Sequence, residues 1–216
     1  VRSKLESHYR DMQDIEFTIE NGRLFMLQTR SGKRTIFAAL NAAVDMVDEG
    51  LIDRDTALMR VPAGSFNQLF APVLDRKSKE KARLLTKGLN ASPGGASGKA
   101  VFSAEDAEAW AARGESVILC RLETSPEDIG GMAVAKGILT ARGGMTSHAA
   151  VVARGMGAPC VAGASELHVD ASTKTITCGD VCIREGDLVA IDGFTGEVFL
   201  GAVDVKPSKI VQVQGA

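Results

Sequence analysis

The stretch Gly143-Gly144-Met145-Thr146-Ser147-His148-Ala149-Ala150-Val151-Val152-Ala153-Arg154 places one histidine where two glycines and two hydroxyl residues run into an apolar helix. The glycines let the backbone turn tightly and approach an anion closely, and Thr146 or Ser147 can cap the helix. His148 then falls in the first helical turn, where unpaired N–H groups and the helix dipole favour a phosphate. An uncharged imidazole keeps a lone pair for attack. The stretch therefore predicts a phosphorylatable His148, with Gly143, Gly144 and Ser147 supporting the phosphate.

A histidine beside a helix start can also be a plain capping or surface residue, which is how we interpret His8 and His168. The helix after His148 is apolar nearly all round, which predicts burial, and glycines and a proline end it before a strand at 160–162. A polar residue at the N-terminus of such a helix favours a functional role. Arg142 and Arg154 flank the loop and are candidates for steadying the phosphate, although Arg154 can equally serve the helix end.

Residues 143–163, GGMTSHAAVVARGMGAPCVAG, resemble the phosphohistidine signature of the phosphoenolpyruvate-utilising enzymes. The Met-Thr-Ser-His order most resembles the pyruvate, phosphate dikinase family. The similarity extends to residues 13–17, 27–34, 170–180 and 185–187, so it covers nearly the whole chain.

The resemblance implies an enzyme in which His148 accepts a phosphoryl group from ATP and passes it to pyruvate, while inorganic phosphate takes the other phosphoryl group. This direction yields AMP, phosphoenolpyruvate and pyrophosphate, and the reverse direction consumes them through the same histidine. The family's regulatory threonine corresponds to Thr146, which implies a regulatory kinase and phosphorylase as partners. The resemblance also implies Mg²⁺ as the cofactor, a homodimeric full-length enzyme and a cytoplasmic location.

Two other functions stay open at this point. One is a phosphoenolpyruvate synthase-type sibling that uses water as the second acceptor. The other is a non-catalytic adaptor module that keeps the fold and uses the loop only to bind a partner. An intact His148 argues against the adaptor.

The N-terminal segment reads as a β-hairpin, because Ile15, Phe17 and Ile19 alternate before a tight Asn21-Gly22 turn. The resemblance implies that this hairpin closes an ATP-grasp nucleotide domain. It also implies that Glu16 lies near magnesium and that Gln28 and Arg30 lie near the ATP phosphates. A simple two-residue turn, however, puts Glu16 opposite Leu27 and sends Gln28 and Arg30 to the other face. Either a bulge intervenes or the three residues do not share one ligand.

The chain divides into four predicted parts: 1–34, the end of the nucleotide-binding domain; 35–88, a helical linker; 89–203, the phosphohistidine domain; and 204–216, a linker toward a C-terminal barrel. In the linker, Leu40, Val44 and Val47 share one helix face, Gly50 ends that helix and Asp53 caps the next. Short strands mixed with a few helices predict a compact α/β domain, and the resemblance implies the swivelling β/β/α fold. No lysine-bearing phosphate loop or pyruvate barrel is found, so we expect a fragment that is inactive alone.

Charge and cysteine usage exclude several other classes. A net charge of −2 gives no reason to expect nucleic acid or an acidic membrane as a partner. The basic run at 76–83 is interleaved with acidic residues, which favours a solvated helix face or linker. The four cysteines lack paired CxxC spacing, so free thiols are expected. A Gly179-Asp180 hairpin turn would send the sulfurs of Cys178 and Cys182 to opposite sides of the sheet.

Overall fold

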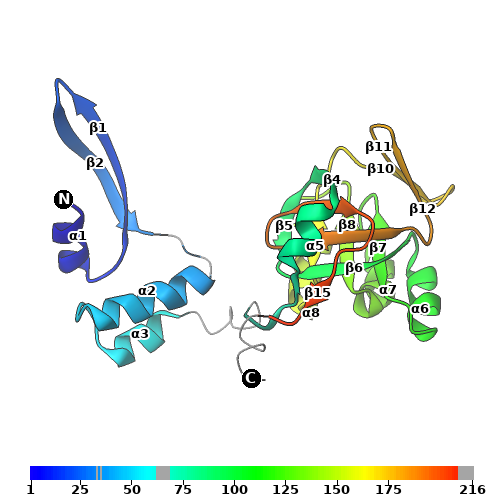
Figure 1. Cartoon of the computed structure of the whole chain (residues 1–216), viewed down its shortest axis with the longest axis horizontal. Coiled ribbons are helices and arrows are strands. Elements are labelled where there is room, and N and C mark those ends of the chain that lie inside the picture. The colour runs from blue at the N-terminus through cyan, green and yellow to red at the C-terminus, as the bar shows by residue number, and fades with distance from the viewer. Residues whose placement is uncertain (33, 35, 62–68, 209–216) are drawn as a thin grey trace. The chain divides into compact units, whose positions relative to one another are not determined.

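The computed structural model describes residues 1–32, 34, 36–61 and 69–208 of the chain, which has a mixed α/β fold (Figure 1). The chain forms two compact units, Val1–Leu69 and Phe70–Ala216. The predicted helical linker at 35–88 is therefore shared between the two units. Among the described residues, no helix is both long and apolar enough to cross a membrane.

The first unit contains a hairpin and several helices. Its elements are α1 (Arg2–Tyr9), β1 (Gln13–Glu20), β2 (Arg23–Ser31), α2 (Ile36–Asp48) and α3 (Arg54–Arg60). The hairpin turns at Asn21 and Gly22, whose φ angles are 49° and 72°. Two successive positive φ values are the requirement of a type I′ turn, which confirms the predicted tight turn.

A bulge in the hairpin resolves the question of which side chains share a face. Glu16 pairs with Gln28 and Phe17 pairs with Met26, so Leu27 is the extra residue between them. Asp14 pairs with Arg30, one step along the same face as Glu16. The bulge alternative is therefore confirmed, and the simple pairing of Glu16 with Leu27 is wrong.

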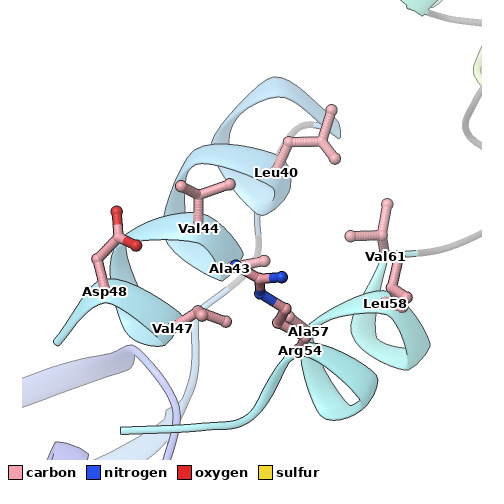
Figure 2. Close-up of a pocket in the computed structure, with 9 residues that line it drawn as sticks. All are labelled: Leu40, Ala43, Val44, Val47, Asp48, Arg54, Ala57, Leu58 and Val61. Carbon is pink, nitrogen blue, oxygen red and sulfur yellow. The ribbon is translucent and has the colours of Figure 1, made fainter. Parts of the chain in front are cut away.

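Helices α2 and α3 leave an open apolar pocket of about 370 Å³ between them (Figure 2). The predicted face of α2 supplies one side of this pocket, and α3 supplies the other. Gly50, with a φ of 70°, follows the end of α2, and the Asp53 side chain accepts a hydrogen bond from the Thr56 amide at 2.7 Å. Both predicted helix boundaries are therefore confirmed. The residues that line the pocket are Leu40, Ala43, Val44, Val47, Asp48, Arg54, Ala57, Leu58 and Val61.

The second unit is built on an eight-stranded sheet in the order β4-β14-β13-β6-β7-β8-β9-β5. Strands β6 to β9 run parallel to one another, and the other neighbours pair antiparallel. The parallel strands are joined by helices, so the sheet centre is a series of β-α-β crossovers. The strands are β4 (Arg83–Lys87), β5 (Leu89–Ser92), β6 (Gly95–Val101), β7 (Val117–Arg121), β8 (Gly137–Thr140), β9 (Cys160–Ala162), β13 (Leu188–Asp192) and β14 (Glu197–Leu200).

The second unit has three layers, with the eight-stranded sheet in the middle. On one face, helices α6 (Ala104–Ala112), α7 (Ile129–Val134) and α8 (His148–Met156) pack small side chains against Val117, Leu119 and Ile138. On the other, a three-stranded sheet contributes Ile176 and Ile183 to the core. The small sheet contains β10 (His168–Asp170), β11 (Thr175–Cys178) and β12 (Val181–Arg184). The layers follow a β/β/α order, as the family resemblance implies.

The cysteines are free, and the small sheet explains why two of them stay apart. Cys178 pairs with Val181 and Thr177 pairs with Cys182, so the two sulfurs point to opposite faces, as predicted. Cys120 and Cys160 are buried, and burial raises the pKa of both thiols to about 12.

Part of the basic run is held against the main sheet rather than solvated. Strands β3 (Val73–Leu74) and β15 (Val205–Lys206) pair beside α5 (Arg76–Lys81). From α5, Lys79 Nζ lies 2.5 Å from Asp192 Oδ2 and 2.6 Å from Glu197 Oε2. Lys87 Nζ lies 3.1 Å from Glu197 Oε1. The prediction of a freely solvated face is therefore wrong for Lys79, whose charge is met by two strand carboxylates.

Glu197 makes the stability of the second unit depend on acid pH. Burial raises the pKa of Glu197, but hydrogen bonds from Lys79, Thr195 and Lys87 outweigh it and hold the pKa at about 2, below its ordinary value of 4.5. A lowered carboxyl pKa stabilises the fold above pH 4.5, and this contribution is lost as the pH falls toward 2. We expect Glu197→Gln to lower the free energy of unfolding by about 1 to 3 kcal/mol at pH 7.

Urea unfolding followed by Trp110, the chain's single tryptophan, measures this difference. The gap between wild type and Glu197→Gln should shrink steadily from pH 4.5 to pH 2. The matched control is Glu80→Gln, which removes an exposed ion pair with Arg76 and should cost less than about 0.5 kcal/mol. A gap that stays constant with pH would contradict the assignment.

Candidate active site

His148 is the first residue of α8, as the sequence predicts. The preceding Ser147 has extended backbone angles, and its side-chain oxygen accepts a hydrogen bond from the Ala150 amide at 3.4 Å. The N-terminal amides of a helix have no acceptor within the helix, so this end of α8 favours negative charge. Of the two hydroxyl residues proposed as caps, Ser147 is the cap, and Thr146 is left exposed.

The imidazole of His148 is half-buried and is held on one side. Its Nδ1 lies 3.0 Å from Thr124 Oγ1, and Thr124 itself is buried. A nitrogen that donates its proton to this hydroxyl leaves the lone pair on the other nitrogen, Nε2. The described part of the chain offers Nε2 no hydrogen-bond partner.

Thr124 is the site residue that sequence reasoning missed. It lies in the acidic turn at 123–128, where the Asp128 side chain accepts a hydrogen bond from the Ser125 amide at 2.8 Å. The signal that points to Thr124 is topological: it follows β7, and the histidine loop follows the adjacent parallel strand β8. The carboxyl ends of neighbouring parallel strands lie at one edge of a sheet, so the two loops meet.

The histidine loop is fixed by its backbone. Gly143 has a φ of 113°, and a Cβ there would lie 2.9 Å from the Ser147 side chain. Gly163 has a φ of 64°, and a Cβ there would lie 2.4 Å from the Gly143 carbonyl oxygen. Arg142 donates its amide proton to the Leu122 carbonyl at 2.8 Å. The loop therefore depends on glycine at 143 and 163, both in conformations that L side chains rarely adopt.

The other predicted residues of the loop are Gly144, Arg142 and Arg154. A Cβ on Gly144 would meet nothing within 4 Å, so the close-approach argument holds for Gly143 only. Arg154 donates from Nε to the Ala150 carbonyl at 2.9 Å and from Nη2 to the Met145 carbonyl. Its guanidinium therefore braces the loop backbone, and the exposed Arg142 is the flanking cation with an accessible side chain.

The predicted nucleotide residues belong to the first unit. Glu16, Gln28 and Arg30 lie on one face of the hairpin, where Arg30 Nε contacts Asp14 Oδ2 at 3.0 Å and Nη2 lies 4.0 Å from Glu16 Oε1. All three are exposed. The described residues contain no group of three or more histidine, cysteine or carboxylate side chains that could hold a metal ion.

Comparison with known proteins identifies both ends of the chain. Residues 113–196 match the family described as "PEP-utilising enzyme, mobile domain", and residues 1–51 match "Pyruvate phosphate dikinase, AMP/ATP-binding domain". The chain is 57% identical to the chloroplastic pyruvate, phosphate dikinase of Flaveria pringlei over 91% of its own length and 21% of the relative's. The pyruvate, phosphate dikinase of Rhizobium meliloti strain 1021 is 54% identical over 94% of this chain and 22% of that protein.

A solution NMR structure of Enzyme I is 28% identical and covers 46% of this chain and 34% of that one, with a TM-score of 0.28. The chain thus spans about a fifth of the length of the curated relatives it matches. The AMP/ATP-binding segment and the mobile-domain segment lie one after the other in this chain. The 57% identity to the Flaveria pringlei protein extends over 91% of the chain. The chain belongs to the pyruvate, phosphate dikinase family of PEP-utilising enzymes.

Proposed function

We propose that this chain is the phosphoryl-carrier portion of a pyruvate, phosphate dikinase. The whole protein would interconvert ATP, pyruvate and phosphate with AMP, phosphoenolpyruvate and pyrophosphate through a phosphohistidine at His148. The observation that carries the proposal is the placement of His148 at the N-terminus of α8, with Nδ1 against Thr124 Oγ1 and Nε2 without a partner among the described residues.

This placement supports Nε2 as the reacting nitrogen. In the step from phosphoenolpyruvate, the Nε2 lone pair forms a bond to phosphorus while the bond between phosphorus and the enol oxygen breaks. The pyruvate enolate leaves and takes up a proton at carbon. In the tautomer proposed here, Nδ1 keeps its proton and donates a hydrogen bond to Thr124 Oγ1, which lies 3.0 Å away, so the ring needs no separate base. The amides at the start of α8 lie beside the transferred dianion and stabilise it.

The nucleotide half of the proposal rests on the hairpin. Arg30 offers a guanidinium suited to phosphate oxygens, and Glu16 a carboxylate suited to a hard cation. Mg²⁺ would bring charge neutralisation for the nucleotide phosphates. Because Arg30 contacts both Asp14 and Glu16, it already orients these carboxylates on one face of the hairpin.

The proposal extends to partners and location. ATP or AMP, phosphate or pyrophosphate, and pyruvate or phosphoenolpyruvate would reach the histidine through neighbouring domains. We include a homodimeric full-length protein, a cytoplasmic location, and a regulatory kinase and phosphorylase acting on Thr146, whose exposed position leaves its hydroxyl accessible.

Phosphoenolpyruvate labelled in its phosphate tests the proposal directly. The full-length protein that contains this chain is incubated with the label and magnesium, and the product is mapped by mass spectrometry and ring-nitrogen NMR. We expect acid-labile label on Nε2 of His148 that moves on to AMP and pyrophosphate. Label on Nδ1 would overturn the nitrogen assignment. Transfer that does not depend on pyrophosphate would instead identify the synthase-type sibling.

Thr146→Asp tests the regulatory site. A permanent negative charge two residues before His148 repels the incoming phosphoryl dianion, so we expect labelling of His148 to fall by at least about tenfold. The matched control is Thr146→Val, which removes the hydroxyl without adding charge and should label at nearly the wild-type rate, because Ser147 caps α8. Full labelling of Thr146→Asp would rule out this electrostatic mechanism.

A further inference from the structure

An ion pair joins the half-buried Arg121 to the buried Asp128, which stand on either side of Thr124 in the sequence. Arg121 Nε lies 3.2 Å from Asp128 Oδ1 without donating a hydrogen bond to it, and Arg121 Nη1 donates to the Phe102 carbonyl oxygen at 2.8 Å. Asp128 is 3% exposed. Arg121 ends β7 and Phe102 directly follows β6, so the guanidinium joins the ends of two neighbouring strands to the carboxylate. A buried carboxylate needs a charge partner and hydrogen bonds, and Asp128 has the Arg121 guanidinium as its charge partner and accepts a hydrogen bond from the Ser125 amide.

The second oxygen of Asp128 reaches the turn that carries Thr124. Asp128 Oδ2 accepts the Ser125 amide proton at 2.8 Å and lies 3.4 Å from Ser125 Oγ. The Ser125 carbonyl in turn accepts the Asp128 amide proton at 3.0 Å. These bonds fix the backbone one residue after Thr124, whose Oγ1 lies 3.0 Å from His148 Nδ1.

We propose that Arg121 and Asp128 are positioning residues that act on His148 through Thr124, an inference that rests on the proposed phosphoryl transfer. With the Asp128 carboxylate in place, Thr124 Oγ1 keeps the position in which it accepts a hydrogen bond from Nδ1–H, so the neutral ring keeps its lone pair on Nε2. Without it, the turn at 123–128 loses its anchor and the hydroxyl no longer selects one tautomer. The nucleophilic form of the ring is then a smaller part of the population.

Ring-nitrogen NMR on the 216-residue chain labelled with ¹⁵N-histidine measures this selection without any reaction. In wild type we expect the neutral His148 ring to carry its proton on Nδ1. Asp128→Asn and Thr124→Val should both move the proton toward Nε2. The control is Glu127→Gln, which removes an exposed carboxylate from the same turn and should leave the nitrogen shifts unchanged. An Asp128→Asn spectrum identical to that of wild type would overturn the inference.

The rate of labelling from phosphoenolpyruvate in the full-length protein supplies the second readout. We expect Asp128→Asn to slow labelling of His148 by about 10- to 100-fold, by analogy with the loss of residues that orient metal-ligating histidines. The Asp128→Asn/Thr124→Val double variant should be no slower than Thr124→Val alone, because both changes act through the same contact. If the two substitutions slowed labelling independently, so that their effects multiplied in the double variant, Asp128 would not act through Thr124.

Arg121→Lys keeps the positive charge but loses the forked geometry, so it should shift the tautomer in the same direction and by less. It serves as the test if Asp128→Asn does not fold, and an unchanged His148 tautomer in Arg121→Lys would then contradict the inference. The two proposals fail separately. Unlabelled wild-type protein would contradict the carrier function, whereas normal labelling with an unaffected Asp128→Asn tautomer would contradict the positioning role alone.

Discussion

Full-length protein with His148→Asn is expected to take up no acid-labile phosphate from phosphoenolpyruvate, a loss of at least about 1,000-fold. Asparagine has no nucleophilic ring nitrogen, and no other described side chain offers a free nitrogen at the start of α8. Ser147 is engaged as the helix cap, and its hydroxyl would form an acid-stable ester rather than an acid-labile bond. Mass spectrometry of the labelled peptide, with and without acid treatment, measures the difference.

His168→Asn is the matched control for this experiment. His168 lies exposed on β10 of the small sheet, and the variant should label like wild type. Thermal unfolding of both variants separates loss of chemistry from loss of fold. Acid-labile label that persists in His148→Asn, or that disappears in His168→Asn, would move the phosphorylated residue elsewhere and leave the adaptor function as the better account of the loop.

The sequence predicts the parts of this site that depend on local signals, because each such signal lies within a few neighbouring residues. A glycine pair, a hydroxyl cap and an apolar helix determine where α8 begins, and the first helical residue is His148. The hairpin is similar, because Asn21-Gly22 determines a type I′ turn by its positive φ values. The strand predicted at 160–162 is likewise present as β9.

The contacts between distant residues depend on which strands become neighbours, and local sequence patterns do not indicate this. Thr124 is 24 residues from His148, and their contact exists because β7 and β8 are adjacent parallel strands. Lys79 is more than 100 residues from Asp192, so one lysine of a basic run that reads as solvated is in fact tied to the sheet. The bulge at Leu27 is also invisible to alternation, because it depends on how the two strands twist around each other.

Gly163→Ala should disable the histidine loop through backbone geometry alone. Residue 163 has a φ of 64°, and an added Cβ would lie 2.4 Å from the Gly143 carbonyl oxygen, so both the residue and the loop must move. We expect the free energy of unfolding of the second unit to fall by about 2 to 4 kcal/mol. A displaced loop also shifts the ring against its substrate, and a shift of about 1 Å is enough to slow labelling of His148 by about 100-fold.

The matched control is Gly155→Ala inside α8, where a Cβ meets nothing within 4 Å and should stabilise the helix by up to about 1 kcal/mol. Urea unfolding and phosphoenolpyruvate labelling measure the two effects separately. A Gly163→Ala protein that labels at the wild-type rate would show that the path of the loop past residue 163 does not govern the position of His148.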